Sequence, residues 1–136
     1  APDVDEERKP TGTTHTVAGA EGYARSADGN FEIELPEPHP AAENLFAAPW
    51  SACFLGALKF AAGKDHIKIP AEATVTADVG IGARDDGQGF GIEVALVIKV
   101  PGVERAVVEG LVQKAHIVCP YSHGTRGNIP VTLTVA

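Results

Sequence analysis

One long stretch decides the fold, AAENLFAAPWSACFLGALKFAA, from Ala41 to Ala62. Its composition is helical, and most of its bulk comes from apolar side chains: Leu45, Phe46, Trp50, Phe54, Leu55, Leu58 and Phe60. From Ala52 to Ala62, Lys59 is the only charged residue. A helix that is apolar nearly all round must be covered on most of its sides. We therefore expect it to pack against the chain's own sheet and to leave a face for a partner chain.

The two stretches that follow have the pattern of β-strands. Ala73 to Ile81 and Gly89 to Val100 are the strongest strand candidates in the chain. The polar loop Arg84-Asp85-Asp86-Gly87-Gln88 lies between them and contains a glycine. This arrangement predicts a long hairpin.

A second helix is expected from about Glu104 to Val118. Apolar residues recur on one side of it: Val107, Val108, Leu111, Val112, Ala115 and Val118. Pro120 ends it, because the residue before a proline avoids the α region. Val131 to Val135 then closes the chain as a strand.

The N-terminal third predicts two short strands. Thr13 to Val17 is rich in β-branched residues, and Phe31 to Leu35 alternates between apolar and acidic residues. Asp28-Gly29-Asn30 is expected to form the turn that joins them. Pro36, Pro38 and Pro40 then end the extended segment and form a short, stiff connection.

Together these elements predict an α+β fold in the order β-β-α-β-β-α-β. Two core helices are expected to pack against a mainly antiparallel sheet. At 136 residues the chain has the length of a single domain. We expect this domain to span residues 13–136, preceded by a flexible acidic tail at residues 1–12.

Composition disfavours several kinds of partner. The chain has 11 Lys and Arg against 18 Asp and Glu, a formal charge of −7, whereas nucleic-acid binding requires clustered positive charge. No stretch approaches the ~20 uninterrupted apolar residues of a membrane span, so we expect no membrane partner. The first nine residues lack the apolar core of a secretory signal. A cytoplasmic location is the default expectation.

The chain has two cysteines. Cys53 lies within the long apolar helix, and Cys119 follows the second helix. One interpretation is that both are small buried apolar residues, which is how free cysteines most often behave. The other is a redox pair, 66 residues apart in sequence and brought together where the helices cross. Spacing alone leaves both interpretations open.

Two motifs carry a resemblance to a known family. The first is ENLFAA at residues 43–48 with SACFLGA at residues 51–57, and the second is AHIVCPYS at residues 115–122. They resemble the two cysteine motifs of the organic hydroperoxide resistance proteins, one branch of the OsmC-like superfamily. The resemblance covers residues 26–135. It implies the OsmC-like fold and an intertwined homodimer.

The resemblance also implies a thiol peroxidase that reduces alkyl and fatty-acid hydroperoxides to alcohols. Cys53 would be oxidised to a sulfenic acid, and Cys119 would condense with it to an intrachain disulfide. Dihydrolipoyl groups on lipoylated proteins would re-reduce this disulfide, and no bound cofactor or metal is expected. The apolar side chains of Phe46, Trp50 and Phe54 would line a slot that prefers organic peroxides over hydrogen peroxide.

A buried thiol needs a nearby cation to become reactive, and the family supplies an arginine held by a glutamate. Glu43 matches that glutamate, although it could also be a first-turn carboxylate that interacts with the helix dipole. Glu43 precedes Cys53 by ten residues, about 15 Å along a straight helix. Either the helix is interrupted, for which Pro49 is a candidate, or Glu43 reaches the cysteine of the other subunit.

The arginine departs from the family pattern. Counting back without gaps from Ser26, Ala20 stands where the resemblance places the arginine. Arg25 lies in the same predicted loop and could replace it, or it could be a solvated charge. Ala20 therefore keeps an alternative open: a protein that binds apolar ligands or senses redox state, with weak or lost peroxidase activity.

Two further patterns are weaker. His116, Cys119 and His123 have a spacing that could bind a metal at a helix end, but three ligands without a second pair make a poor zinc site. The glycines between residues 80 and 91 lie between two predicted strands. A phosphate-binding loop joins a strand to a helix, so we interpret these glycines as turn and bulge residues.

Overall fold

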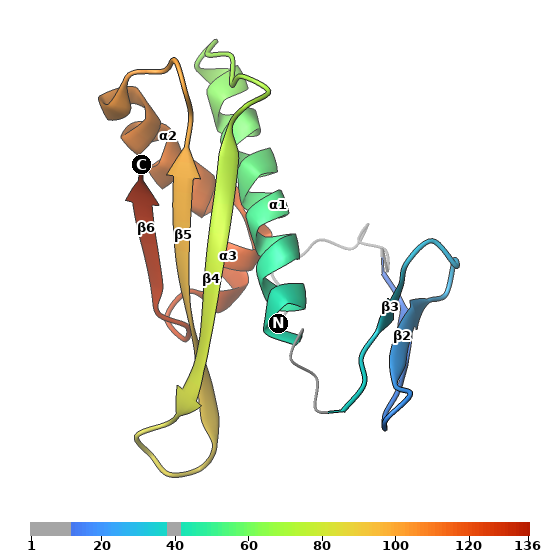
Figure 1. Ribbon diagram of the computed structural model, residues 1–136. Helices are drawn as coiled ribbons and strands as arrows, with labels where there is room; N and C mark the ends of the chain where they lie inside the picture. The colour runs from blue at the N-terminus through green and yellow to red at the C-terminus, as the bar shows by residue number, and fades with distance from the viewer. Residues whose placement is uncertain (1–11, 38–41) are drawn as a thin grey trace, which may run out of the picture. The chain divides into compact units, whose positions relative to one another are not determined.

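The computed structural model describes residues 12–37 and 42–136. The chain forms two compact units, an N-terminal unit that ends at Ala42 and a core unit from Glu43 to Ala136. The N-terminal unit contains strands β1 to β3, and the core unit contains nearly all of α1 followed by β4, β5, α2, α3 and β6 (Figure 1). Each unit is described by itself below.

The sheet of the core unit has the order β4-β5-β6. Strands β4 (Thr74–Ala83) and β5 (Phe90–Lys99) are antiparallel, as expected for the predicted hairpin. Gly87 in the loop between them has a φ of 69°, a conformation that glycine adopts without strain. Strand β6 (Val131–Val135) pairs with β5 in parallel. One face of this sheet carries Val79, Val94 and Val131 in one line across the three strands.

Three helices complete the core unit: α1 (Ala42–Lys64), α2 (Arg105–Val118) and the short α3 (Pro120–Thr125). Helices α1 and α2 lie on the same side of the sheet (Figure 1). The core between them is formed by buried residues of α1, β5 and α2: Trp50, Phe54, Leu58, Val94, Leu96, Ile98, Val108, Leu111 and Val112. Each large apolar side chain that is fully buried contributes about 1.5–3 kcal/mol. This packing fixes α1 in place.

Helix α1 runs unbroken through Pro49. Of the two alternatives that the sequence left open for Glu43, an interruption of the helix at Pro49 is therefore wrong. Proline removes one backbone hydrogen bond and crowds the preceding turn, at a cost of about 3 kcal/mol. The adjacent Trp50 and the next buried residue, Phe54, are both fully buried against the core, and their burial offsets this cost.

The N-terminal unit is a three-stranded antiparallel sheet, β1 (Thr14–Val17), β2 (Tyr23–Ser26) and β3 (Glu32–Glu34). The sequence predicted the outer two strands but not β2. The turn at Asp28-Gly29-Asn30 therefore joins β2 to β3, and not β1 to β3 as expected. Strand β2 is short, and Ala24 is the only fully buried position in it, so it shows no alternating pattern.

Side chains hold this turn together. The Ser26 hydroxyl donates to the Asp28 carboxylate at 2.6 Å, and the backbone N–H of Asn30 donates to the same oxygen at 2.9 Å. These bonds to the charged form, that of Ser26 above all, hold the pKa of Asp28 below its ordinary value.

The α+β class, the long hairpin, the second helix and the final strand are confirmed. Three of the four strand pairings are antiparallel, so the sheet structure is mainly antiparallel as predicted. Helix α3 was not expected, because Pro120 was interpreted only as the end of the second helix. Proline also suits the first position of a helix, and Pro120 occupies it in α3. The tail up to residue 11 and the prolines at 38 and 40 lie outside the described residues.

Helix α1 is long and apolar enough to cross a membrane, judged by length and composition alone. The core helix of a soluble protein passes the same test. In this chain α1 buries one face against the sheet and α2, which is the arrangement of a core helix.

We expect Pro49→Ala to raise the free energy of unfolding by about 1–3 kcal/mol, because alanine restores the missing backbone N–H inside α1. Chemical denaturation at a fixed protein concentration measures the change. The control is Ala48→Gly at the exposed neighbouring position, which we expect to lower the same quantity by about 1 kcal/mol. An unchanged or lower stability of Pro49→Ala would contradict the account of α1.

Candidate functional site

Cys53 lies on α1 at the edge of the buried face. Trp50 precedes it by three residues and Ala57 follows it by four, so the three side chains share one side of the helix. Trp50 and Ala57 are buried, whereas Cys53 is half-buried and carries a free thiol. The thiol thus sits on a rigid core helix and is still partly open to the exterior.

Cys119 lies at the junction of α2 and α3 and is fully buried. It leaves the helical conformation, with φ −64° and ψ 122°, because Pro120 follows it. Its backbone N–H donates to the carbonyl of Ala115 at 2.8 Å, and its own carbonyl accepts from the N–H of His123 at 2.9 Å. Both helices therefore hold the Cys119 backbone, and its thiol is free in this structure.

An aromatic contact joins the two cysteine motifs. The ring of Trp50 stacks on the ring of Tyr121, with centroids 6.3 Å apart and an angle of 27° between the planes. The second aromatic neighbour of Trp50 is Phe46, whose ring packs edge-on against it with the ring centroids 5.8 Å apart. Trp50 lies one helical turn from Cys53, and Tyr121 lies two residues after Cys119. The stack therefore brings the segment around Cys53 next to the segment around Cys119, as the redox interpretation requires.

The neighbourhood of this stack contains polar groups without partners. Within the described residues, the buried Trp50 Nε1, Ser122 Oγ and His116 Nδ1 have no hydrogen-bond partner. An unsatisfied buried polar group costs about 1–3 kcal/mol, and native proteins leave few of them. Neither Ser122 nor Tyr121 was predicted from the sequence as a functional residue, although both belong to the motif around Cys119.

The three residues expected to line an apolar slot differ in exposure. Trp50 and Phe54 are fully buried, whereas Phe46 is half-buried at the margin of the core. The slot itself remains a prediction.

Glu43 lies in the first turn of α1 and is half-buried. Because α1 is unbroken, the ten residues between Glu43 and Cys53 correspond to about 15 Å along the axis. Glu43 therefore does not reach Cys53 of its own chain. Of the two routes by which Glu43 could serve a cysteine, the one through a second subunit remains.

Arg25 belongs to β2 of the N-terminal unit and is exposed. Its guanidinium donates to the Glu32 carboxylate at 3.2 Å and lies over the Tyr23 ring, 4.8 Å from the centroid. The hydrogen bond and the charge of Glu32 raise the pKa of Arg25 above its ordinary value. Glu32 was not predicted from the sequence as a partner of Arg25, because their pairing across β2 and β3 follows only once β2 is known. Ala20 lies in the turn between β1 and β2.

The spacing of His116, Cys119 and His123 was judged a poor zinc site from the sequence. In the part of the chain that the structure describes, no three His, Cys, Asp or Glu side chains gather as metal ligands would. His116 is only partly buried, and burial lowers the pKa of its imidazole, with the nearby Arg126 charge as a second cause. The Arg126 guanidinium also donates to the backbone carbonyl of His116 at 2.7 Å.

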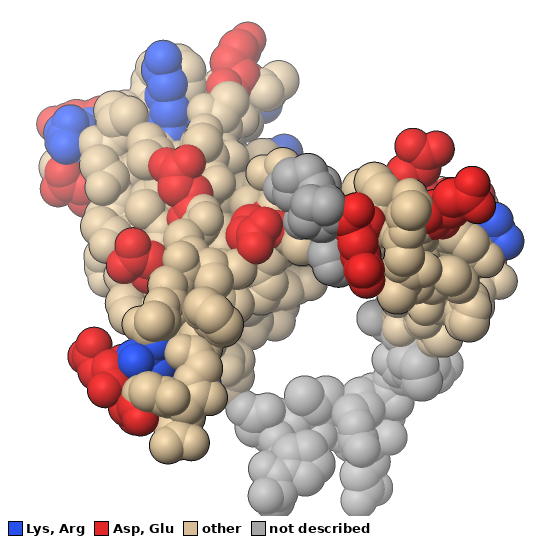
Figure 2. Space-filling view, turned by 60° about the horizontal axis from the view of Figure 1, so that its bottom comes forward, with Lys and Arg blue, Asp and Glu red and all other residues tan. Residues whose placement is uncertain are grey.

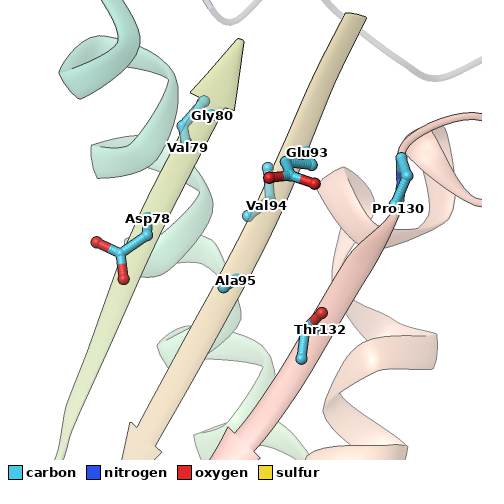
Figure 3. Close-up of a pocket in the computed structure, with 8 residues that line it drawn as sticks. All are labelled: Asp78, Val79, Gly80, Glu93, Val94, Ala95, Pro130 and Thr132. Atoms are coloured by element: carbon cyan, nitrogen blue, oxygen red, sulfur yellow. The ribbon is translucent and has the colours of Figure 1, made fainter. Parts of the chain in front are cut away.

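A hollow lies on the face of the core sheet opposite to the helices. Figure 3 shows it with Asp78, Glu93 and Thr132 directed away from the helices. It is lined by two carboxylates and contains no cysteine. It therefore lacks the thiol chemistry of the site around Cys53 and Cys119.

The charged side chains of the described residues form no continuous basic surface on the face shown in Figure 2. Lys and Arg occur there singly, among more numerous Asp and Glu. This distribution matches the net charge of −7 and offers nucleic-acid phosphates no run of positive charge on that face.

Comparisons with known proteins point in one direction. Residues 35–134 match the family described as OsmC-like protein. The chain is 46% identical over 135 residues to the organic hydroperoxide resistance protein of Xanthomonas axonopodis pv. citri, which covers 91% of this chain and 94% of that protein. It is 41% identical over 136 residues to the organic hydroperoxide resistance protein OhrA of Bacillus subtilis, with 93% and 95% covered.

Solved structures give the same result. A crystal structure of an organic hydroperoxide resistance protein from Elizabethkingia anophelis matches with a TM-score of 0.84 at 42% identity. The match covers 96% of this chain and 98% of that one.

His116 makes stability depend on pH. Burial lowers its pKa in the folded protein, so the unfolded chain takes up the proton first as the pH falls below about 6.5. We expect the free energy of unfolding to fall between pH 7 and pH 5, and this fall to be smaller in His116→Gln. Denaturant unfolding at the two pH values measures it.

The matched variant is Arg126→Gln, which removes the lesser cause of the shift. We expect it to keep most of the pH dependence, because burial is the larger cause. Identical pH profiles for the wild type and His116→Gln would contradict this account of His116.

Proposed function

The chain belongs to the OsmC-like family and, within it, to the organic hydroperoxide resistance proteins, and we propose that it is a cysteine peroxidase that reduces alkyl and fatty-acid hydroperoxides to alcohols. The resemblance inferred from the two cysteine motifs is thereby confirmed. The observation that carries the proposal is the stack of Trp50 on Tyr121, which holds the two cysteine segments in one core.

The exposure of the two thiols supports their division of roles. Cys53 is half-buried and is the thiol that a peroxide from solution meets first. Its thiolate attacks one oxygen of the peroxide, the O–O bond breaks, and the other oxygen leaves as the alcohol after protonation. Cys119 is fully buried, so it is shielded from the peroxide and reacts only with the sulfenic acid formed on Cys53.

The exposed part of α1 supports the proposal of a homodimer. Ala52 and Gly56 are exposed, and the Phe60 ring is 55% exposed. These three residues recur every fourth position, so within the core unit they form one exposed apolar face of α1. A second copy of this chain would cover that face, and its cysteine would then be the one that Glu43 serves.

In this proposal the activating cation is Arg25. Its guanidinium is held by Glu32 within the N-terminal unit, and the charge of a guanidinium next to Cys53 would favour the thiolate. Arg25 would have to exchange or share its partner, with Glu43 as the second carboxylate. We propose that Arg25 in this way takes the place of the family arginine, whose expected position is occupied by Ala20.

The remaining features of the proposal concern the reductant and the location. We propose that dihydrolipoyl groups of lipoylated proteins reduce the Cys53–Cys119 disulfide, that the enzyme carries no bound cofactor, and that it acts in the cytoplasm. Both redox-active atoms are sulfur atoms of the chain itself, so the chemistry needs only an external dithiol.

The second candidate is a protein that binds apolar ligands or senses redox state with little peroxidase turnover. The observation that favours it is the pairing of Arg25 with Glu32, because a guanidinium engaged there is not free to activate a thiol. The pH dependence of Cys53 alkylation separates the two. Alkylation that accelerates only near the free-thiol value of about 8.5 favours the second candidate.

The test of the first proposal is consumption of cumene hydroperoxide with dihydrolipoamide as the reductant. We expect turnover in the wild type, none in Cys53→Ser because the nucleophile is lost, and none in Cys119→Ser because the sulfenic acid is not resolved. Ser51→Ala, two residues from Cys53 with its hydroxyl bonded to the Ala47 carbonyl at 2.9 Å, is the matched control and should retain turnover. A wild type with reduced thiols and no turnover would contradict the proposal.

Arg25→Ala tests the proposed cation. We expect it to lower the rate of Cys53 oxidation by about tenfold or more, because loss of an adjacent charge reduces the thiolate fraction. An unchanged rate of Cys53 oxidation in this variant would contradict the role of Arg25 and indicate that another cation activates the thiol.

The apolar slot predicts that cumene hydroperoxide reacts faster than hydrogen peroxide. The two rates of Cys53 oxidation are compared in the wild type under the same conditions. A faster reaction with hydrogen peroxide would contradict the slot.

A further inference from the structure

Ser122 has a buried hydroxyl that the fold does not use. The side chain is fully buried, and its Oγ has no hydrogen-bond partner within the described residues. A buried hydroxyl without a partner destabilises the folded state, and alanine in its place would remove that cost. Because this serine is unfavourable for folding, we looked for a state of the protein in which its hydroxyl has a hydrogen-bond partner.

Ser122 lies beside Cys119. Cys119 immediately precedes α3, and Ser122 is the third residue of that helix. The hydrogen bond from the His123 N–H to the Cys119 carbonyl, 2.9 Å long, closes the turn that contains both residues. The two residues are three positions apart, the spacing at which side chains of a helical turn become neighbours.

The protonation state of Cys119 decides whether the hydroxyl finds a partner. In this structure, where Cys119 is a free thiol, the Ser122 hydroxyl makes no hydrogen bond to the Cys119 sulfur, so the bond requires a rotation of the Ser122 side chain. A neutral thiol is a weak acceptor that would reward this rotation little. A thiolate is a charged acceptor, and hydrogen bonds to charged groups are about twice as strong as neutral ones. The Ser122 hydroxyl would therefore stabilise the thiolate of Cys119 over its thiol. An interaction stronger in the reacting state than in the resting state accelerates a reaction.

We propose that Ser122 is a positioning residue for the resolving reaction, in which its hydroxyl donates to the Cys119 sulfur as that sulfur becomes a thiolate. This inference rests on the proposed peroxidase function. The Cys119 sulfur attacks the Cys53 sulfur of the sulfenic acid, the S–S bond forms and the S–O bond breaks. The hydroxide that leaves takes up the Cys119 proton as water.

Single-turnover kinetics test the proposal with one equivalent of cumene hydroperoxide. In Ser122→Ala we expect Cys53 to be oxidised at the wild-type rate, whereas disulfide formation slows by about tenfold to a hundredfold because a donor to a charged group is lost. Trapping with dimedone should detect a Cys53 sulfenic acid that persists in the variant. Ser122→Thr keeps the hydroxyl and should restore most of the rate.

Ser51→Ala is the matched control, since it removes a hydroxyl near the other cysteine that is already bonded to the Ala47 carbonyl. It should change neither step. Ser122→Ala should also keep or raise the unfolding midpoint, because it removes an unsatisfied buried group. A Ser122→Ala variant that fails to fold would show a structural role and overturn the proposal.

A second readout follows the thiolate directly. In Cys53→Ser, Cys119 is the only thiol of the chain, and its ultraviolet thiolate absorbance can be followed against pH. Adding Ser122→Ala should move the midpoint of this curve to higher pH, whereas a merely structural serine would leave it in place.

The single-turnover results distinguish a failure of the role proposed for Ser122 from a failure of the proposed peroxidase function. A wild type that forms no sulfenic acid contradicts the proposed peroxidase. A wild type that forms and resolves the sulfenic acid, with Ser122→Ala resolving it equally fast, contradicts only the role of Ser122.

Discussion

The stack of Trp50 on Tyr121 is the contact on which the candidate site depends. It joins α1 to the start of α3, two elements far apart in the sequence, and each ring lies within three residues of a cysteine. The stack is held in turn by the core, because Trp50 belongs to the same buried face of α1 as Phe54 and Leu58. Aromatic pairs of this kind contribute about 0.5–1.5 kcal/mol beyond the area they bury, so the contact stabilises the fold and positions the site together.

The two cysteines differ in the way that a two-step thiol reaction requires. Cys53 is half-buried on a rigid helix, whereas Cys119 is fully buried where the backbone changes direction before Pro120. Close to them in sequence, the polar hydrogens of Trp50 and Ser122 have no acceptor among the described residues. Proteins keep such unfavourable groups mainly where function uses them. The local instability of this region is thus consistent with chemistry that creates new acceptors, a thiolate or a peroxide oxygen, during the reaction.

Much of the fold could be predicted from the sequence, because long periodic segments carry a strong signal. The hairpin around Gly87, the second helix and the final strand were found in this way. Strand β2 was missed since Tyr23–Ser26 has one fully buried residue and no alternation. The long helix was also predicted, but the sequence left open whether Pro49 interrupts it. The structure shows α1 unbroken, because the burial of Trp50 and Phe54 outweighs the local preference of proline. For the site, the motifs identified both cysteines, but the stacking of Tyr121 and the burial of Ser122 depend on a turn that only the structure defines.

The central claim is that Cys53 and Cys119 form one redox site, and peptide mapping after oxidation tests it most directly. The reduced protein is treated with one equivalent of cumene hydroperoxide, digested without reductant and analysed by mass spectrometry. The account predicts one intrachain disulfide that links the peptide of Cys53 to the peptide of Cys119. Two free thiols after treatment, or a disulfide only between subunits, would contradict it.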